Sequence, residues 1–89
     1  MGQHQPPGRI HGRVIDEAGQ PVPRASVRVR DDIVIVDLQT TNQRGEFTSR
    51  LLFAGEYSVE VEYKGRRGSV DGVAVTLGET TPVTIPLQD

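Results

Sequence analysis

Apolar and polar residues alternate with a period of two along most of this chain. In the clearest run, Tyr57, Val59 and Val61 are separated from one another by single polar residues. Such alternation is typical of β-strands that bury one face and expose the other. No window of about ten residues shows the spacing of an amphipathic helix. The pattern therefore predicts an all-β chain.

Turn-forming residues interrupt the alternation about every eight to twelve positions, which is typical of a β-sandwich or barrel. Turns are expected at 16–19, 31–32, 42–45, 64–68 and near Gly78. The intervening strands are expected at 9–16, 25–30, 33–41, around Phe47, and at 50–62, 73–77 and 83–87. Seven short strands in one chain predict an immunoglobulin-like antiparallel β-sandwich. Residues 1–8 contain no apolar residue after Met1 and are expected to be a disordered lead-in or a cloning remnant, with 9–89 as a single domain.

A few positions carry specific expectations about packing. Phe47 is expected to point into the core. Gly12 lies between two inward-facing residues and indicates a bulge or a close approach of another chain segment. Pro82 and Pro86 cannot donate to a hydrogen-bond ladder, so they place the last strand at a sheet edge. The β-branched run 33–36 is expected to form a strand that is covered on both faces at its start.

Composition and charge narrow the function classes. The chain has 89 residues, with 35% hydrophobic and 25% charged residues, as expected for one soluble globular domain. Its net charge of -2 argues against nucleic-acid binding or an anionic membrane surface. The absence of cysteine excludes disulfides and thiol catalysis. No apolar run is long enough for a membrane span or a signal peptide, so we expect no membrane insertion by this segment.

Charged residues gather in two patterns. Lys64, Arg66 and Arg67 lie in the glycine-containing segment 64–68 and predict a basic hairpin tip, which in most proteins is simply a solvated turn. Four further charges on two neighbouring strands suggest cross-strand ion pairs. These four are Arg28, Arg30, Glu60 and Glu62.

Several stretches, taken in order over residues 9–87, resemble the carboxypeptidase regulatory-like domain, a transthyretin-like β-sandwich. These stretches are Ile10–Asp16, Gly19–Pro23, Ala25–Val27, Thr41 with Gly45–Phe47, Gly55–Val61, Val73–Val75 and Val83–Leu87. The chain departs from the family pattern at Arg24, where glycine more often precedes the alanine. That departure puts the backbone conformation of Arg24 in question.

The resemblance implies a non-catalytic accessory module of a larger extracellular, periplasmic or cell-surface protein. Its implied roles are structural support or protein–protein interaction, and its implied partners are other domains of the parent protein or a separate protein. It transfers no carboxypeptidase activity, because the peptidase zinc site lies in a different domain. We therefore expect no enzymatic activity, no catalytic residue, no cofactor and no metal.

Catalytic and crosslinking alternatives lack the residues they need. His4 and His11 are the only histidines and are not spaced as metal ligands. The related hydroxyisourate hydrolases carry a C-terminal Tyr-Arg-Gly-Ser, which the mid-chain segment 66–69 only partly echoes, and no later histidine offers a general base. An isopeptide bond of the collagen-adhesin B type is excluded because the only lysine, Lys64, and the only asparagine, Asn42, lie in turns. Turn carboxylates could bind calcium, although solvated turns explain them as well.

A carbohydrate-binding module with a starch-binding-like sandwich remains the alternative function. Sugars stack on exposed aromatic rings, and the chain has two phenylalanines and two tyrosines. Because Phe47 and Tyr57 are expected to point inward, only two rings are left as platforms for a polysaccharide. The candidate contacts for a ligand or partner are therefore Phe53 and Tyr63. Arg66 and Arg67 of the basic turn are added as candidate contacts. The sequence leaves open which face binds, the identity of the partner and the oligomeric state.

Overall fold

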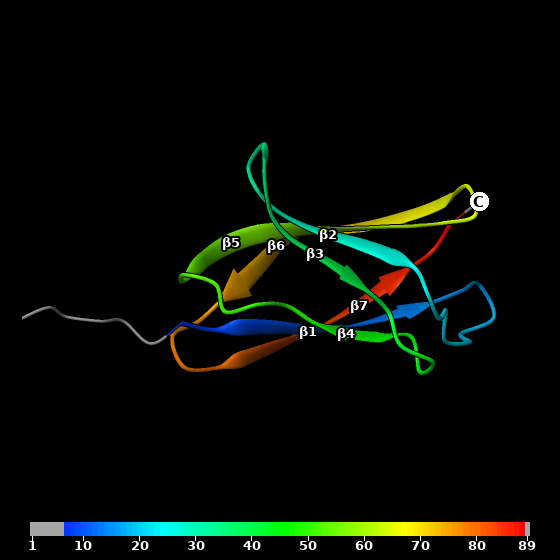
Figure 1. The fold of residues 1–89 in the computed structure, drawn as a ribbon, viewed down its shortest axis with the longest axis horizontal. Helices are drawn as coiled ribbons and strands as arrows, with labels where there is room; N and C mark the ends of the chain where they lie inside the picture. The colour runs from blue at the N-terminus through cyan, green and yellow to red at the C-terminus, as the bar shows by residue number, and fades with distance from the viewer. Residues whose placement is uncertain (1–6, 89) are drawn as a thin grey trace, which may run out of the picture.

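A computed structural model describes residues 7–88 and shows seven strands in two sheets, with no helix among the described residues. The strands are β1 (Arg9–Ile15), β2 (Ser26–Asp31), β3 (Val34–Thr40), β4 (Glu46–Thr48), β5 (Gly55–Tyr63), β6 (Arg66–Val75) and β7 (Thr80–Pro86). The predicted all-β sandwich of seven strands is therefore confirmed. Figure 1 shows the two layers, with β1, β4 and β7 below β2, β3, β5 and β6.

The smaller sheet has the order β4-β1-β7 and the larger sheet the order β3-β2-β5-β6. All neighbours are antiparallel except β1 and β7, which run parallel from the pair Arg9↔Thr80 to the pair Ile15↔Pro86. The first and last strands are therefore hydrogen-bonded neighbours in the smaller sheet. β7 lies at the edge of this sheet, as Pro82 and Pro86 predicted.

The core forms between the inward faces of the two sheets. Its members follow the predicted alternation, and most are small aliphatic side chains, so that Phe47 and Tyr57 are the only buried aromatic residues among those described. The side chains that are almost completely buried are Ile10, Val14, Val27, Val29, Val59, Ile85 and Leu87. This alternation leaves the opposite face of each strand in solvent.

Phe47 packs directly over Gly12. The two residues are Cα partners in the β1–β4 pair, and a Cβ atom at Gly12 would overlap the Phe47 ring. Phe47 is only 4% exposed. Of the two expectations for Gly12, the close approach is confirmed, while the register of β1 with β4 continues without a bulge. The missing side chain at Gly12 therefore makes the space that the aromatic ring fills.

Side-chain caps fix two of the predicted turns. Asp16 Oδ1 accepts hydrogen bonds from the backbone N–H groups of Ala18 and Gln20, at 2.9 Å each. Asn42 Oδ1 accepts from the N–H groups of Arg44 and Glu46, at 2.8 and 3.0 Å. Such turns are favoured by Asp and Asn because their short side chains reach backbone two residues ahead.

The expectation that both faces of 33–36 would be covered is wrong. Ile33 is 83% exposed and Val34 57% exposed. The turn lies at 32–33 rather than 31–32, and β3 is an edge strand of the larger sheet. β-Branched residues favour extended backbone whether or not they are buried, so their run indicated a strand but not its cover.

Several further boundaries differ from expectation. The strand expected at 50–62 begins only at Gly55, the strand expected at 73–77 covers Arg66–Val75, and the strand expected at 83–87 covers Thr80–Pro86. The turn after β5 contains only Lys64 and Gly65, so Arg66 and Arg67 lie in strand β6 rather than in a basic hairpin tip. Gly8 exchanges backbone hydrogen bonds with Leu52, at 2.9 and 2.8 Å, and therefore belongs to the sandwich. The other expectations for the N-terminal segment fall on residues 1–6, outside the described residues.

Arg24 adopts a left-handed backbone conformation, with φ of 61°. This explains why the family more often has glycine there, since a side chain makes this conformation unfavourable by roughly 1–2 kcal/mol. The exposed Arg24 side chain makes no hydrogen bond or ion pair within residues 7–88, while its N–H donates to Thr41 O at 3.0 Å. The backbone contact, not the side chain, anchors this turn.

We expect Arg24→Gly to raise the free energy of unfolding by up to about 1 kcal/mol, because it relieves the left-handed strain at a modest entropic cost. Arg24→Val should lower it by at least about 1 kcal/mol, because β-branched residues tolerate positive φ poorly. Urea denaturation of the two variants measures both changes. Equal stabilities of the two variants would contradict the assigned backbone conformation.

We expect Phe47→Ala to lower the free energy of unfolding by about 3–5 kcal/mol through the cavity it leaves. Gly12→Ala should lower it by about 1–3 kcal/mol, because the added methyl group displaces the ring. In the Phe47→Ala background, the same Gly12→Ala change should have a much smaller effect. A double-mutant cycle by thermal and urea denaturation measures this coupling; additive effects would show that the two residues do not share this space.

Candidate functional site

Large apolar side chains are exposed along β3, in the turn before it and on the segment 51–53. Seven of them in residues 7–88 are more than a third exposed, and six of these seven come from residues 33–38 and 51–53. We call these six the apolar patch: Ile33, Val34, Ile35, Leu38, Leu51 and Phe53. Ile35 and Leu38 lie on the outer face of the larger sheet, because they are Cα partners of Arg30 and Arg28. Several large exposed apolar side chains in two nearby segments are typical of an interaction site, whereas single exposed apolar residues are common on any surface.

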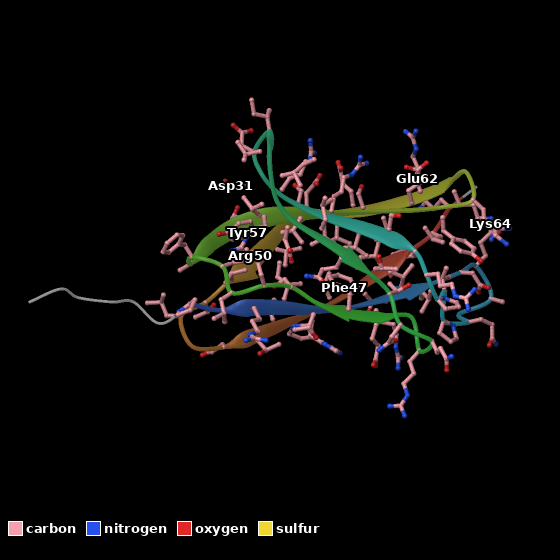
Figure 2. The ribbon with its side chains drawn as sticks, in the orientation of Figure 1. Asp31, Phe47, Arg50, Tyr57, Glu62 and Lys64 are labelled. Carbon is pink, nitrogen blue, oxygen red and sulfur yellow. The ribbon has the colours of Figure 1, made fainter. Side chains whose placement is uncertain are left out.

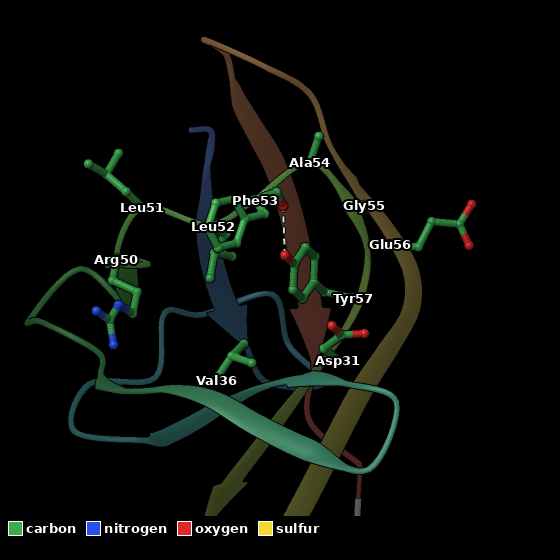
Figure 3. A pocket seen from close by; sticks show the side chains of 10 residues that line it. All are labelled: Asp31, Val36, Arg50, Leu51, Leu52, Phe53, Ala54, Gly55, Glu56 and Tyr57. Atoms are coloured by element: carbon green, nitrogen blue, oxygen red, sulfur yellow. Dashed lines mark hydrogen bonds between the residues drawn. The ribbon is translucent and has the colours of Figure 1, made fainter. Parts of the chain in front are cut away.

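Two neighbouring cavities are lined in part by residues of the apolar patch. The larger, of about 400 Å³, is lined by Asp31, Val36 and residues 50–57 (Figure 3). The smaller, of about 240 Å³, is lined by residues 35–38 and Arg50. The two cavities share Val36 and Arg50 as lining residues, and together we call them the β3 groove. Pockets that hold small ligands or peptide side chains have volumes of this order.

The segment 50–54 forms one wall of the groove and is fixed by hydrogen bonds from three directions. Asp37 Oδ2, on β3, accepts from the Arg50 N–H at 2.8 Å and from Gln39 Nε2 at 3.0 Å. Leu52 pairs with Gly8 through two backbone bonds. The Tyr57 hydroxyl donates to the Phe53 carbonyl oxygen at 2.6 Å. The wall is therefore held in place although Phe53 itself is 83% exposed.

Burial raises the pKa of the Tyr57 phenol, and the nearby negative charge of Asp31 raises it further. Both influences favour the protonated phenol, which is the form that can donate a hydrogen bond. The bond from Tyr57 to the Phe53 carbonyl therefore persists at neutral pH and above it.

Charges of both signs line the groove. Arg50 lies where the two cavities meet, and its guanidinium forms no ion pair with any of the described residues. Figure 3 shows Glu56 on the opposite side of the larger cavity from Arg50, with Asp31 nearer to Tyr57. The groove thus presents Arg50, which has no ion-pair partner among the described residues, together with the Asp37 carboxylate in its middle, and the carboxylates of Asp31 and Glu56 line the larger cavity.

Ion pairs cover the outer face of the larger sheet instead. Glu60 on β5 accepts from Arg28 at 3.5 Å and from Arg30 at 2.8 Å, which confirms the predicted cross-strand pairs for these residues. Glu62 takes no part, because the β2–β5 register places it across from Ser26. These pairs are partly exposed and stabilise the fold only slightly.

The structure does not bring the four predicted contact residues together. Phe53 lies at the groove, whereas Tyr63, Arg66 and Arg67 lie at the opposite end of β5, about 25 Å away at the usual rise per strand residue. Figure 2 shows this separation, with Arg50 and Tyr57 towards one end and Lys64 at the other. Tyr63 packs partly against the core, and Lys64 Nζ lies 5.3 Å from its ring centre. Of the four, only Phe53 belongs to the apolar patch.

Sequence reasoning missed most of the groove. Asp37 and Arg50 gave no motif, because their contact joins residues far apart in the sequence. The apolar run 33–36, followed by Leu38, was the sequence feature that could have indicated the patch if these side chains had been expected to be exposed. Elsewhere, His11 Nδ1 lies 2.9 Å from Thr48 Oγ1. Within the described part of the chain, no group of three His, Cys, Asp or Glu residues is arranged to hold a metal ion.

The fold and its surface define a class of protein: a small accessory β-sandwich module. Residues 9–88 match the family model of the carboxypeptidase regulatory-like domain, and the chain belongs to that family. No curated protein matches the chain in a sequence search. The structure between residues 7 and 88 contains no helix long and apolar enough to cross a membrane.

Solved structures with the same fold come from larger proteins. A DUF3823 family protein from Parabacteroides merdae has a TM-score of 0.70 and 22% identity, over 96% of this chain and 47% of its own. A candidate carbohydrate-binding protein from Bacteroides uniformis has a TM-score of 0.65 and 22% identity, over 90% and 41%. A chain of a type II cohesin–X-dockerin complex from Acetivibrio cellulolyticus has a TM-score of 0.60 and 18% identity, over 88% and 56%. This chain therefore spans less than two thirds of each of these proteins.

We expect Tyr57→Phe to lower the free energy of unfolding by about 0.5–1.5 kcal/mol at pH 7, because the Phe53 carbonyl loses its donor. The raised pKa also has an alkaline consequence: above about pH 10 the unfolded phenol ionises first, so stability falls as pH rises. This part of the alkaline loss should be absent from Tyr57→Phe. Denaturation at pH 7, 9 and 11 compares the variant with the parent chain, and Tyr63→Phe is the control. Identical pH profiles for Tyr57→Phe and the parent would contradict the shift.

Proposed function

We propose that this chain is a non-catalytic accessory module of a larger extracellular or cell-envelope protein, and that it binds a protein surface through the apolar patch. The observation that carries the proposal is the exposure of six large apolar side chains on β3, the turn before it and the segment 51–53, from 49% for Ile35 to 83% for Phe53. Burying such side chains against a partner is favourable by roughly 1.5–3 kcal/mol for each one that becomes fully buried.

The size of the module suits this role. A standard protein–protein interface covers about 800 Å² on each partner, and the described chain exposes 5906 Å² in total. One end of the sandwich can therefore supply one such interface. The patch also surrounds a preformed groove whose wall is fixed by hydrogen bonds, so little ordering is needed on binding.

The two ends of the described chain lie at opposite ends of the sandwich. Gly8 enters beside Leu52, next to the patch, whereas Gln88 pairs with Arg67 at the opposite end (Figure 1). A domain that precedes this one would emerge near the apolar patch, and a domain that follows would start at the far end. The similarity to segments of longer proteins agrees with this arrangement.

Carbohydrate binding is the second candidate function. Phe53 offers one highly exposed ring beside a cavity of about 400 Å³, and one structural neighbour is named as a candidate carbohydrate-binding protein. The second expected platform, Tyr63, packs partly against the core at the other end of the sandwich. Because a single ring gives little stacking area for a polysaccharide, protein binding is the function that the geometry favours.

Site-specific photo-crosslinking in cells that produce the full-length protein tests the proposal. We expect a photoreactive phenylalanine analogue at position 53 to give discrete protein adducts, because this position lies in the patch. The same analogue at position 63 is the matched aromatic control and should give few. Changing Ile35 and Leu38 together to serine should abolish the adducts at position 53.

Equal adducts at positions 53 and 63, or none at position 53, would contradict docking through the patch. Glycan-array binding that is lost in Phe53→Ala, in the absence of protein adducts, would favour the carbohydrate alternative. Circular dichroism and thermal denaturation check that each variant is folded. Since the changed side chains are exposed, the expected effects on stability are within about 0.5 kcal/mol.

A further inference from the structure

The two sheets have four edge strands, and three of these edges are protected against pairing with another chain. β4 contains only three residues, and β7 carries Pro82 and Pro86. On β6, Gly72 adopts φ of 68° where the register with β5 shifts, and Arg67 already pairs with Gln88. Short strands, prolines and bulges are the usual means of preventing edge-to-edge association.

β3 is different from these three edges. It has seven residues, without proline or lysine, and forms a sheet ladder only with β2. A bulge near Val36 interrupts the ladder, which leaves residues 37–40 as its regular stretch. Its one charged residue, Asp37, already accepts hydrogen bonds from Arg50 and Gln39. β3 therefore shares a bulge with β6, but it has neither the prolines of β7 nor the short length of β4, and residues 37–40 remain a regular, unpaired edge.

The backbone groups that face outward can be assigned from the register. Thr41 donates to Ala25 O and accepts from Arg24 N, both at 3.0 Å, so its backbone groups point towards the β2 side. Backbone groups in an antiparallel strand alternate in direction from residue to residue. The N–H and C=O groups of Leu38 and Thr40 therefore point away from β2, towards the open edge.

The β3 groove lies beside this open edge. Residues 35–38 line its smaller cavity, and Leu51, Leu52 and Phe53 line the larger one. An extended segment along β3 could thus pair with backbone groups and place alternate side chains in the groove. The Arg50 guanidinium, which has no ion-pair partner within residues 7–88, lies where the two cavities meet. A carboxylate is the group that complements it.

We propose that the outer edge of β3 binds an extended segment of a partner protein as an added strand, with apolar side chains in the β3 groove and a carboxylate beside Arg50. This inference rests on the proposed function, because it specifies the partner chemistry for the same surface. Strand addition combines main-chain hydrogen bonds, which supply affinity, with side-chain pockets, which supply specificity.

The test uses a short synthetic peptide of alternating valine and threonine with one central glutamate, titrated into the isotope-labelled chain and followed by amide NMR shifts. We expect shift changes at residues 34–40 and 50–53. A peptide with lysine in place of glutamate should bind about fivefold more weakly, and Arg50→Gln should remove this preference. A peptide with the same side chains but N-methylated on alternate residues should bind about tenfold more weakly, because it lacks the pairing donors.

Two variants at one position separate backbone pairing from side-chain contact. Leu38→Ala and Leu38→Pro both remove the leucine side chain, but only Leu38→Pro removes the outward N–H. We expect Leu38→Pro to bind the peptide about three- to tenfold more weakly than Leu38→Ala. Proline is tolerated at edge positions whose N–H faces outward. The N-methylated peptide gives the same comparison without changing the protein.

The outcomes distinguish this inference from the proposed function. Shift changes outside residues 34–40 and 50–53, or equal binding by the N-methylated and unmethylated peptides, would overturn strand addition. If adducts at position 53 persist in that case, docking through the patch stands without added-strand pairing. Concentration-dependent dimerisation in sedimentation velocity that is lost in Leu38→Pro would instead assign the edge to a second copy of the chain, and would also overturn the inference.

Discussion

The close packing of Phe47 against Gly12 is the contact on which the arrangement of this sandwich depends. It joins β4, which has only three residues, to the centre of β1. The core is otherwise made mostly of small aliphatic side chains, so no other aromatic ring from the smaller sheet fills the space between the layers. Because the chain continues directly from β4 into residues 49–54, this contact also positions the wall of the β3 groove.

The groove lies between β3, which is an edge strand of the larger sheet, and the segment 50–54, which forms no regular strand. On one side of the molecule, β3 and the segment 50–54 approach each other without pairing as strands, and Asp37 joins them through the Arg50 N–H. Tyr57 then fixes the Phe53 carbonyl from within the core. Leu51 and Phe53 consequently remain exposed, although hydrogen bonds fix the backbone that carries them. The proposed docking of a partner protein rests on this exposed apolar surface and on the hydrogen bonds that hold its backbone.

Much of the fold follows from local patterns. Period-two alternation locates the strands, Asp16 and Asn42 cap turns that the sequence indicates, and two prolines place β7 at an edge. The positive φ of Arg24 falls at the position where the family more often has glycine. These features were predictable because they depend on backbone geometry within a few residues, and on the inability of proline to donate a hydrogen bond.

The candidate site was largely unpredictable for the opposite reason. The residues 33–36 have the composition of a buried strand, and only the order β3-β2-β5-β6 leaves them at an edge. Likewise, the position of Tyr63 far from Phe53 depends on the length and direction of β5. The sequence by itself determined the approximate positions of the strands, most of their inward faces and the resemblance to the family. The tertiary structure alone decided which apolar residues stay exposed, because exposure depends on which strands become neighbours across long stretches of chain.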